Sequence, residues 1–560
     1  MHPATSVKWE RVGSGKRAGV LAPVFCVFSE KNKDKISFSN LNLLVDWASR
    51  CGFSILQLLP MNEMGPLSCP YDAVSSFALQ TSYLNLSKDD FLKASKDLKN
   101  KEYLDFKEDN TYWLRDFSLF KILKLYYGGK AWYDWEDRFR YRDSSALDNF
   151  IRQNLDELEF QSWLQWKASL ALSQVRKYAN NKKVLLKGDL PILVSRDSAD
   201  VWQHPEFFKL EFAAGAPPDM YTAKGQRWGM PTYNWEMIEK DGFRYLKEKL
   251  KYAQNFYDIL RIDHVVGLFR IWSIPYNEPL ENQGLNGFFD PTDETLWRAH
   301  GRKILSVINE STSMLICAED LGVIPKACTE TLEELGIPGN DVQRWVKDWR
   351  GRHDFLPSVE YRNFSVAMLS THDTTNWAAW WENEAGTVDE AMFVRKCNDR
   401  SINYQNVRER LFDLTRSGHG RMRWLEEVDS ADKLIGILGK ERSVLADFID
   451  IYENTYREKE KLWKQFKLPG AIREKCDRQI VEAAFKVTIS SRSIFDIETI
   501  IDWLYLGDIF KGDPYQYRIN TPGTVSKDNW SLRIPVPLEE LIASPLCEKI
   551  KKMVKDSGRA

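Results

Sequence analysis

The stretch "DILRIDHVVG" (residues 258–267) decides the fold, because it places an Arg, an Asp and a His within an apolar run. Such a run is typical of a strand buried on both faces of a parallel sheet. Side chains two positions apart in a strand point the same way, so we expect Arg261 and Asp263 to share one face, with His264 on the other. A buried charge is costly unless it is paired or used. The pattern therefore predicts either a structural ion pair or a catalytic carboxylate held by a guanidinium.

Seven further apolar runs recur along the chain, with helix-like segments between them. Buried strands that alternate with helices indicate a parallel sheet, and eight of them predict a (β/α)8 TIM barrel of the α/β class. A doubly wound sheet would instead place a Gly-rich phosphate loop after its first strand, and "VFSEKNKDKI" (27–36) is not such a loop. The seven runs are 19–28, 53–61, 183–192, 313–322, 365–373, 493–501 and, the least apolar of them, 340–346.

Acidic side chains and a His lie at or near the ends of four of these runs. In a TIM barrel the carboxyl ends of the strands bear the catalytic groups. The sequence therefore predicts a cluster of acids at one end of the barrel. Its members are Asp189, Asp263, Glu319, His372 and Asp373.

The uneven spacing of the runs predicts one catalytic domain over residues 1–560 with three large insertions. We expect segment 80–175 to be helical and aromatic, and segment 374–490 to be helical and charged. Segment 200–250 is rich in Gly, Pro and aromatic residues, which is typical of a lid and substrate loop above a barrel. Because the first strand begins near residue 19, we expect no separate N-terminal carbohydrate-binding domain.

Composition and charge exclude several classes of function. The net charge of −2 offers no basic excess for nucleic acid. The longest apolar stretch (18–28) has 11 residues, too few to cross a bilayer. The charge run at 451–467 is typical of a solvated helix face and not of a binding site. We therefore expect neither a nucleic-acid partner nor a membrane, while the oligomeric state is left open.

Cysteine usage and aromatic content add two further expectations. The eight Cys are scattered without a C-x-x-C pair, and no secretory signal is visible, so we expect reduced thiols and a cytoplasmic location. The 21 Trp residues suit stacking on sugar rings, but an aromatic core accounts for most of them equally well.

The predicted acid cluster suits a retaining glycosidase, which needs an ionised nucleophile and a protonated acid in different environments. The positive charge of Arg261 favours the ionised form of Asp263. Glu319 and Asp320 are neighbours, and repulsion between their charges should raise the pKa of one of them. Structural ion pairs or helix caps are the alternative for each acid taken alone. A metal cluster is a further alternative, although no H-x-H or H-E-x-x-H motif occurs. That cluster would comprise Asp189, Asp263, His264, His372 and Asp373.

Seven blocks of sequence follow one another along the chain. They are 56–78, 187–208, 215–235, "RIDH" (261–264), "AEDLG" (318–322), "THD" (371–373) and "RINTPGTVSKDNWSLR" (518–533). In sequence and in order, these blocks resemble the 4-alpha-glucanotransferases, which are the amylomaltase or disproportionating-enzyme family of the alpha-amylase superfamily. The resemblance runs nearly from end to end.

The resemblance implies roles for three carboxylates: Asp263 as nucleophile, Glu319 as acid/base and Asp373 as a third acid that grips sugar hydroxyls. It implies retaining transfer of glucosyl or glucan segments from a maltooligosaccharide to the 4-hydroxyl of glucose or a glucan. Neither a cofactor nor a metal is implied. The substrate-binding residues that it implies are Tyr71, Asp189, Tyr221, Gln226, Trp228, Arg261, His372 and Asn520.

The chain also departs from the family's usual blocks. "VVGL" (265–268) stands where the family has Phe-Arg-Gly-Phe, and "FRIW" (269–272) is similar to the plant cytosolic disproportionating enzyme. These departures leave the acceptor open. Two alternatives for function follow: a hydrolase of the same superfamily, and an inactive glucan-binding protein, which would require the loss of a catalytic acid.

Overall fold

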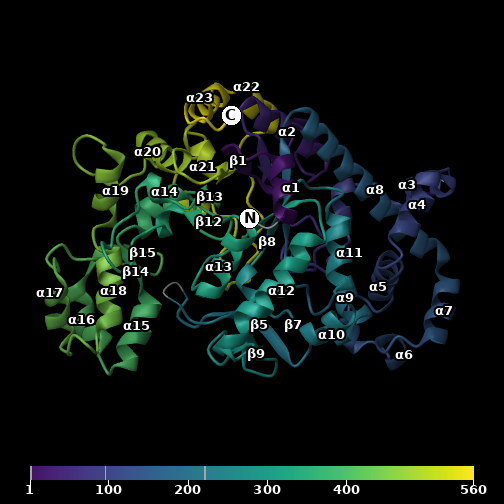
Figure 1. Cartoon of the computed structure of the whole chain (residues 1–560), viewed down its shortest axis with the longest axis horizontal. Helices are drawn as coiled ribbons and strands as arrows, with labels where there is room; N and C mark the ends of the chain where they lie inside the picture. The colour runs from purple at the N-terminus through teal and green to yellow at the C-terminus, as the bar shows by residue number, and fades with distance from the viewer. Residues whose placement is uncertain (1–2, 95, 220–221) are drawn as a thin grey trace.

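The computed structural model describes residues 3–94, 96–219 and 222–560, and eight parallel strands form a near-closed barrel within it (Figure 1). The strands are β1 (Arg17–Leu21), β2 (Ile55–Gln57), β3 (Leu185–Leu190), β8 (Ile259–Ile262), β11 (Leu315–Ala318), β12 (Gly339–Val342), β13 (Ser365–Met368) and β17 (Phe495–Thr499). Their order in the sheet is β11-β8-β3-β2-β1-β17-β13-β12. The two edges approach where the Ala318 N–H donates to the Pro338 carbonyl at 2.8 Å. The TIM-barrel prediction and all eight predicted strands are confirmed.

The register of the sheet brings charged residues together at one end of the barrel. Every residue of β8 is buried, including Arg261, as expected for a sheet that is covered on both faces. The pairing of β3 with β8 sets Asp189 directly beside Arg261. The strand pattern therefore supplies both members of an ion pair from different parts of the sequence.

Segment 80–175 is helical, and it lies at the right of Figure 1. Part of it, including Phe117 and Phe150, shares one hydrophobic core with the barrel. A smaller cluster around Tyr103 and Trp166 forms a separate core. The helices are α3 (Lys88–Lys93), α4 (Lys101–Asp109), α5 (Leu114–Tyr126), α6 (Asp137–Arg140), α7 (Ser144–Gln153) and α8 (Leu155–Asn181).

Segment 200–250 and the residues after β8 form two small antiparallel sheets beside the barrel. One has the order β10-β9-β5-β6, and the other pairs β4 with β7. The loop 217–229 follows β5 in the chain and includes β6, the edge strand that pairs with β5. The strands are β4 (Phe208–Lys209), β5 (Phe212–Ala216), β6 (Gln226–Arg227), β7 (Thr232–Tyr233), β9 (Ile271–Pro275) and β10 (Phe288–Asp290), with helices α9 (Ala199–Gln203), α10 (Trp235–Lys240) and α11 (Arg244–Ala253) nearby in the chain.

Segment 374–490 contains helices and, in addition, a three-stranded antiparallel sheet in the order β14-β16-β15. Residues 387–456, at the lower left of Figure 1, are built around a hydrophobic core of their own. We call residues 387–456 the outer lobe. Its elements are β14 (Thr387–Asp389), α15 (Glu390–Asp399), α16 (Tyr404–Leu411), β15 (Phe412–Gly418), β16 (Arg421–Trp424), α17 (Ala431–Leu438) and α18 (Ala446–Thr455); α14 (Trp377–Ala379), α19 (Glu458–Phe466) and α20 (Arg478–Ile489) flank it.

The charge run at 451–467 is not simply a solvated helix face, so that prediction was wrong in part. Glu458 and Lys459 are buried at the start of α19. Glu458 pairs with the buried Lys347, and its other carboxylate oxygen accepts the Gly386 N–H at 2.6 Å. The run therefore helps to attach the outer lobe to the barrel.

The remaining helices pack around the barrel. No helix among residues 3–94, 96–219 and 222–560 is both long and apolar enough to cross a membrane. All eight cysteines are free. These helices are α1 (Pro3–Val12), α2 (Ser39–Arg50), α12 (Trp297–Glu310), α13 (Lys326–Leu335), α21 (Ile500–Tyr505), α22 (Leu538–Ala543) and α23 (Leu546–Asp556).

Candidate active site

Arg261 lies at the centre of the predicted acid cluster. One nitrogen, Nη1, donates to both oxygens of Asp189 at 2.7 and 2.8 Å and to Asp263 Oδ1 at 2.9 Å. Arg261 is 7% exposed and Asp189 is 3% exposed, so water competes little for these bonds. The structure confirms that Arg261 and Asp263 lie on one side. A buried guanidinium thus fixes the orientation of the Asp263 carboxylate.

His264 does not lie on the opposite face of a regular strand, because β8 ends at Ile262. It adopts a left-handed conformation with φ of +42°, and its backbone N–H donates to Glu319 Oε2 at 2.7 Å. Burial, followed by the charges of Arg261 and Arg270, lowers the pKa of His264 to about 4. The neutral ring therefore supports the turn, and the backbone of His264 holds Glu319.

Glu319 follows β11 and is held by two backbone donors. The second is the Leu321 N–H, at 3.0 Å from Oε1. Burial raises the pKa of Glu319 to about 7; Arg261 opposes this rise and the charge of Asp263 adds to it. The neighbour expected from the sequence, Asp320, instead pairs with Arg362 at 2.6 Å. The charge that perturbs Glu319 comes from Asp263, so the predicted cause was wrong.

The pKa of Asp263 is higher than the neighbouring Arg261 guanidinium alone would make it. Burial raises the pKa of Asp263 to about 6, although the charge of Arg261 opposes the rise. The predicted influence of Arg261 is present, because its charge favours the ionised form, but burial outweighs it. Because the pKa of Glu319 is raised further, a single shared proton favours Glu319 and leaves Asp263 ionised. The two acids differ in the sense that a nucleophile and a general acid require.

Asp373 lies beyond β13 and stays ionised. Asn520 Nδ2 donates to Asp373 Oδ1 at 2.7 Å, and His372 Nε2 lies 3.2 Å from Asp373 Oδ2. Burial would raise the pKa of Asp373, but the charge of His372 and hydrogen bonds from His372 and Asn520 lower it to about 2. Asp373 is thus a permanent anion with close to half of its side chain exposed.

Aromatic rings line the same end of the barrel. Tyr71 OH donates to Asp189 Oδ2 at 2.7 Å, and its ring stacks on His372 with centroids 5.1 Å apart. Trp530 packs against Tyr71 at 5.7 Å and against His372 at 6.0 Å. Trp530 was not among the predicted substrate contacts, although it lies within the block 518–533. Its position could have been suspected from the Asn520 prediction in that block.

The loop 217–229 reaches the cluster through Trp228. Trp228 Nε1 donates to Gln226 Oε1 at 3.0 Å, and the Trp228 ring packs edge-on against His264 with centroids 4.9 Å apart. Because the His264 backbone holds Glu319, Trp228 lies two contacts from the predicted acid. Tyr221, the remaining predicted substrate contact, lies outside the described residues.

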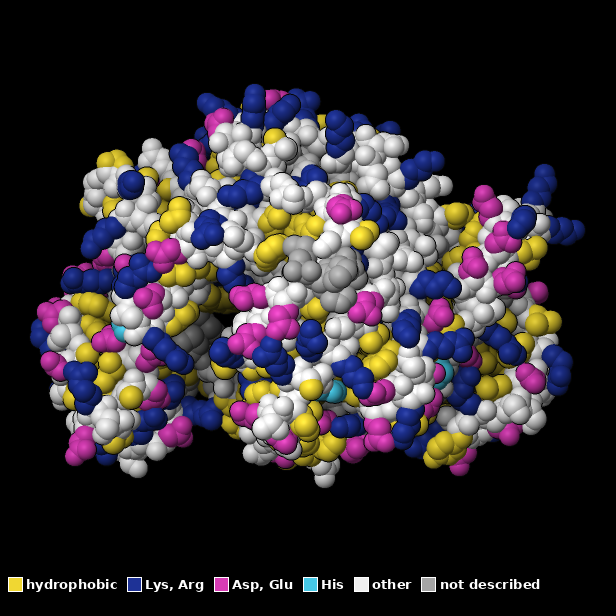
Figure 2. Space-filling model, in the orientation of Figure 1, with side chains coloured by type: hydrophobic (Ala, Val, Ile, Leu, Met, Phe, Trp, Pro, Cys, Tyr) yellow, Lys and Arg dark blue, Asp and Glu magenta, His cyan; other side chains and the backbone are white. Residues whose placement is uncertain are grey.

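The same loop also touches the outer lobe. Arg395 of α15 donates through Nη1 to the carbonyl of Ala223, and Ala223 packs against the core of the outer lobe. Figure 2 shows a hollow between the outer lobe and the body of the barrel. The loop therefore connects two units that are otherwise separated on this face.

The arrangement combines two half-buried acids of unequal proton affinity, a third ionised carboxylate and a wall of aromatic rings. Such a set is typical of enzymes that cleave glycosidic bonds with retention. Within the part of the chain that the structure describes, no group of three or more His, Cys, Asp or Glu residues is arranged to hold a metal.

Comparison with known sequences establishes the family. Residues 22–100 and 88–539 match the family Glyco_hydro_77, 4-alpha-glucanotransferase. A 4-alpha-glucanotransferase of Chlamydia muridarum is 30% identical over 96% of this chain and 94% of its own length. The chain belongs to the 4-alpha-glucanotransferase family. The 4-alpha-glucanotransferase DPE2 of Oryza sativa subsp. japonica is 26% identical over 66% of this chain and 58% of its own, which bears out the partial similarity to the plant enzyme.

Comparison with solved structures supports the fold. An amylomaltase from Streptococcus agalactiae, solved in complex with acarbose, superposes with a TM-score of 0.71 at 21% identity, covering 97% of this chain and 100% of that one. An amylomaltase from Corynebacterium glutamicum superposes with a TM-score of 0.68 at 18% identity, covering 99% of this chain and 77% of that one. The barrel and its surrounding elements are thus those of amylomaltases.

Proposed function

We propose that Asp263 is the nucleophile, Glu319 the acid/base and Asp373 the sugar-gripping third carboxylate of a retaining 4-alpha-glucanotransferase. The observation that carries this assignment is the geometry around Arg261 and His264, which orients Asp263 and Glu319 separately. The family supplies the reaction class: transfer of a glucan segment to a 4-hydroxyl.

In the first half-reaction, Asp263 Oδ attacks the anomeric carbon of the donor and forms a glycosyl ester. The bond from that carbon to the departing glycosidic oxygen breaks, and Glu319 gives its proton to this oxygen. The raised pKa of Glu319 keeps that proton available at neutral pH. Asp373 accepts hydrogen bonds from sugar hydroxyls and favours the distorted ring of the transition state.

In the second half-reaction, Glu319 acts as a base. It takes the proton from the 4-hydroxyl of an acceptor sugar, whose oxygen attacks the anomeric carbon from the face opposite Asp263. The ester bond breaks and Asp263 becomes a carboxylate again. Two inversions at one carbon leave the α configuration unchanged.

Substrate contacts are proposed for the residues that surround these acids. Tyr71 and Trp530 present aromatic surface suited to the apolar face of a sugar ring, and the buried His372 ring stacks against Tyr71. Polar contacts to hydroxyls come from Asn520, whereas the buried Asp189 and Arg261 pair supports the substrate site from behind, since the Asp189 side chain has no exposed surface. Gln226, Trp228 and Tyr221 belong to the loop 217–229, which we propose covers the bound glucan as a lid.

The preferred substrates of this site are maltooligosaccharides and longer alpha-glucans. Neutral, polyhydroxylated chains match a cleft with aromatic walls and fixed carboxylates. The free thiols at all eight cysteines are consistent with a cytoplasmic location, which we also propose.

A single experiment separates transfer from hydrolysis. The protein is incubated with maltose and with maltotriose separately, and the product chain lengths and the released reducing ends are measured. A transferase gives a ladder of longer and shorter chains with no net gain of reducing ends. A net gain that accounts for the products would establish the hydrolase alternative instead, and an unchanged substrate in both tubes would favour the inactive glucan-binding protein.

A further inference from the structure

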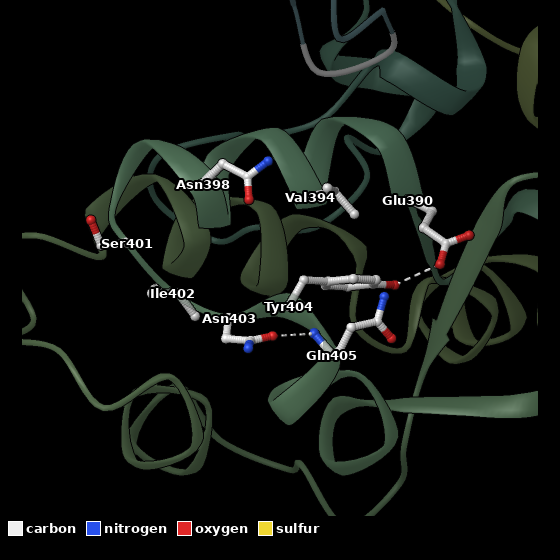
Figure 3. Close-up of a pocket in the computed structure, with 8 residues that line it drawn as sticks. All are labelled: Glu390, Val394, Asn398, Ser401, Ile402, Asn403, Tyr404 and Gln405. Carbon is white, nitrogen blue, oxygen red and sulfur yellow. Dashed lines mark hydrogen bonds between the residues drawn. The ribbon is translucent and has the colours of Figure 1, made fainter.

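A pocket of about 660 Å³ lies in the outer lobe, outside the carboxylate cluster (Figure 3). One wall is a face of α15, where Glu390, Val394 and Asn398 follow at four-residue intervals and therefore lie side by side. The other wall is the start of α16, with Tyr404 and Gln405. Its volume is in the range of pockets that hold small molecules or short oligomers.

The inner part of the pocket is held by a hydrogen bond and an ion pair. Tyr404 OH donates to Glu390 Oε1 at 2.8 Å, and Arg408 Nε lies 3.2 Å from the same oxygen. Figure 3 shows the Tyr404 ring between Val394 of α15 and Gln405. The pocket thus has a fixed aromatic and aliphatic centre, which suits the C–H surface of a ligand.

The rim of the pocket is polar and can hydrogen-bond. The side-chain amides of Asn398 and Gln405 have no hydrogen-bond partner within the described residues, and the Asn403 side chain uses only its oxygen, to cap α16 through the Gln405 N–H at 3.0 Å. An amide offers both a donor and an acceptor, as a sugar hydroxyl does. Of the described residues that line the pocket, Glu390 alone is charged, so the pocket disfavours anions and suits a neutral, polyhydroxylated ligand.

The pocket lies close to the lid. Arg395, the residue after Val394 on α15, donates to the Ala223 carbonyl of the loop 217–229. One helix of about 15 Å therefore borders both the lid and the pocket. A glucan chain that is bound in this pocket would therefore remain near the catalytic acids.

We propose that this pocket is a second glucan-binding site, which holds part of a long alpha-glucan while another part occupies the catalytic cleft. The inference rests on the family activity for the identity of the ligand. Its consequence is a preference for long glucans: binding at two places on one chain raises the effective concentration of that chain at the cleft. Short oligosaccharides cannot gain in this way.

The test compares Asn398→Ala/Gln405→Ala with a matched control, Asn180→Ala/Asn181→Ala, which removes two exposed amides at the end of α8. Electrophoretic retardation in gels with increasing glycogen gives the dissociation constant for a long glucan. Maltotriose disproportionation reports the catalytic cleft. We expect the pocket variant to raise the glycogen dissociation constant about fivefold to tenfold, with maltotriose turnover unchanged.

The outcomes are distinguishable. Equal retardation of wild type, pocket variant and control overturns the second site, as does a wild type that glycogen does not retard. A parallel loss of glycogen binding and maltotriose turnover also overturns it, because the pocket residues would then act through the cleft. A wild type that is retarded by glycogen but leaves maltotriose unchanged contradicts the proposed function and not the pocket.

Discussion

The barrel and the outer lobe are built on separate hydrophobic cores, and only the barrel supplies the predicted catalytic acids. The barrel core extends from Trp9 to Val554 and takes in both ends of the described chain. Among the described residues, the buried members of the outer-lobe core lie between Val388 and Tyr452, with Phe393 among four aromatic neighbours. Covalent chemistry therefore depends on long-range packing, whereas the outer lobe depends on local packing.

The difference between the two cores indicates which part of the molecule controls the chemistry and which part controls the choice of glucan. Asp189, Arg261 and Asp263 are fixed by strand register and by mutual hydrogen bonds. The outer lobe reaches the surroundings of this site through several described contacts, among them the Arg395 hydrogen bond to Ala223 and the stacking of His419 on Tyr515. We infer that the barrel determines whether the reaction occurs, and that the outer lobe influences which glucan takes part.

The largest expected effect comes from Asp263→Asn, which tests the barrel side. A neutral amide cannot form the glycosyl ester, so transfer should fall by at least about a thousandfold. Arg261 keeps its buried partner Asp189, so folding should be largely retained. Maltotriose turnover and a thermal melt measure the two effects. Substantial activity in the folded variant would show that Asp263 is not the nucleophile.

Separation of the two cores is tested by Phe393→Ala, with Phe495→Ala of β17 as the matched barrel variant. Both rings are fully buried, and each truncation should cost about 3–5 kcal/mol. We expect hydrogen exchange to rise mainly in residues 387–456 for Phe393→Ala and throughout the barrel for Phe495→Ala. Maltotriose turnover should persist only in the former. Exchange that rises everywhere in both variants would show a single cooperative unit.

Glu319→Gln should lower turnover of ordinary glucans about a hundredfold, because proton transfer to the leaving oxygen is lost. Wild-type kcat/KM should rise with pH through about 6, as Asp263 ionises, and fall above about 7, as Glu319 loses its proton. The variant should lack the fall at high pH. With a glucosyl fluoride donor, which needs no acid, mass spectrometry should detect a glucosyl adduct on Asp263. An adduct on another residue would refute the pairing.

Trp228→Ala should raise the ratio of hydrolysis to transfer about tenfold while the carboxylates still react. Removal of this ring opens the lid side of the cleft, and water then competes for the ester. Reducing-end release compared with chain redistribution on one maltooligosaccharide measures the ratio. If both activities fall in equal proportion, the loop binds the donor and does not exclude water.

The smallest expected effect is that of Arg395→Ala, which removes the described hydrogen bond between outer lobe and lid. The ratio of hydrolysis to transfer should rise about twofold to threefold, since one net hydrogen bond is lost. Arg410→Ala, an exposed arginine of α16, is the control and should leave the ratio unchanged. An equal shift in both variants would indicate a general effect of charge on the outer lobe.

The barrel and its acids could be predicted from sequence because local patterns specify them. Apolar runs that end in Asp or Glu give both the strand and the position of the carboxylate, as at Asp263 and Glu319. The Arg261–Asp263 contact follows from alternation along a strand. These features need only a few neighbouring residues.

What escaped prediction depends on partners that are distant in sequence. The pKa of Asp263 is set mainly by burial, which the whole fold creates. Asp320 turns to Arg362, and no local signal announced that partner. In the sequence, Glu458 is one more charge in a charged helix, and its buried partner Lys347 is 111 positions away. The contact between the lid and α15 joins residues 172 positions apart.

The left-handed turn at His264 has a consequence for the timing of catalysis. Its backbone N–H holds Glu319 while its ring rests against Trp228 of the lid. If the loop 217–229 withdraws as the proposed lid, the turn would lose this packing partner at the moment when bulk water enters. Water would then meet the glycosyl ester while the turn that holds Glu319 is less well packed, whereas a bound acceptor sugar would meet a Glu319 that is held in place. A single residue in an unusual backbone conformation would thereby link the position of the proposed lid to the orientation of the proposed acid/base.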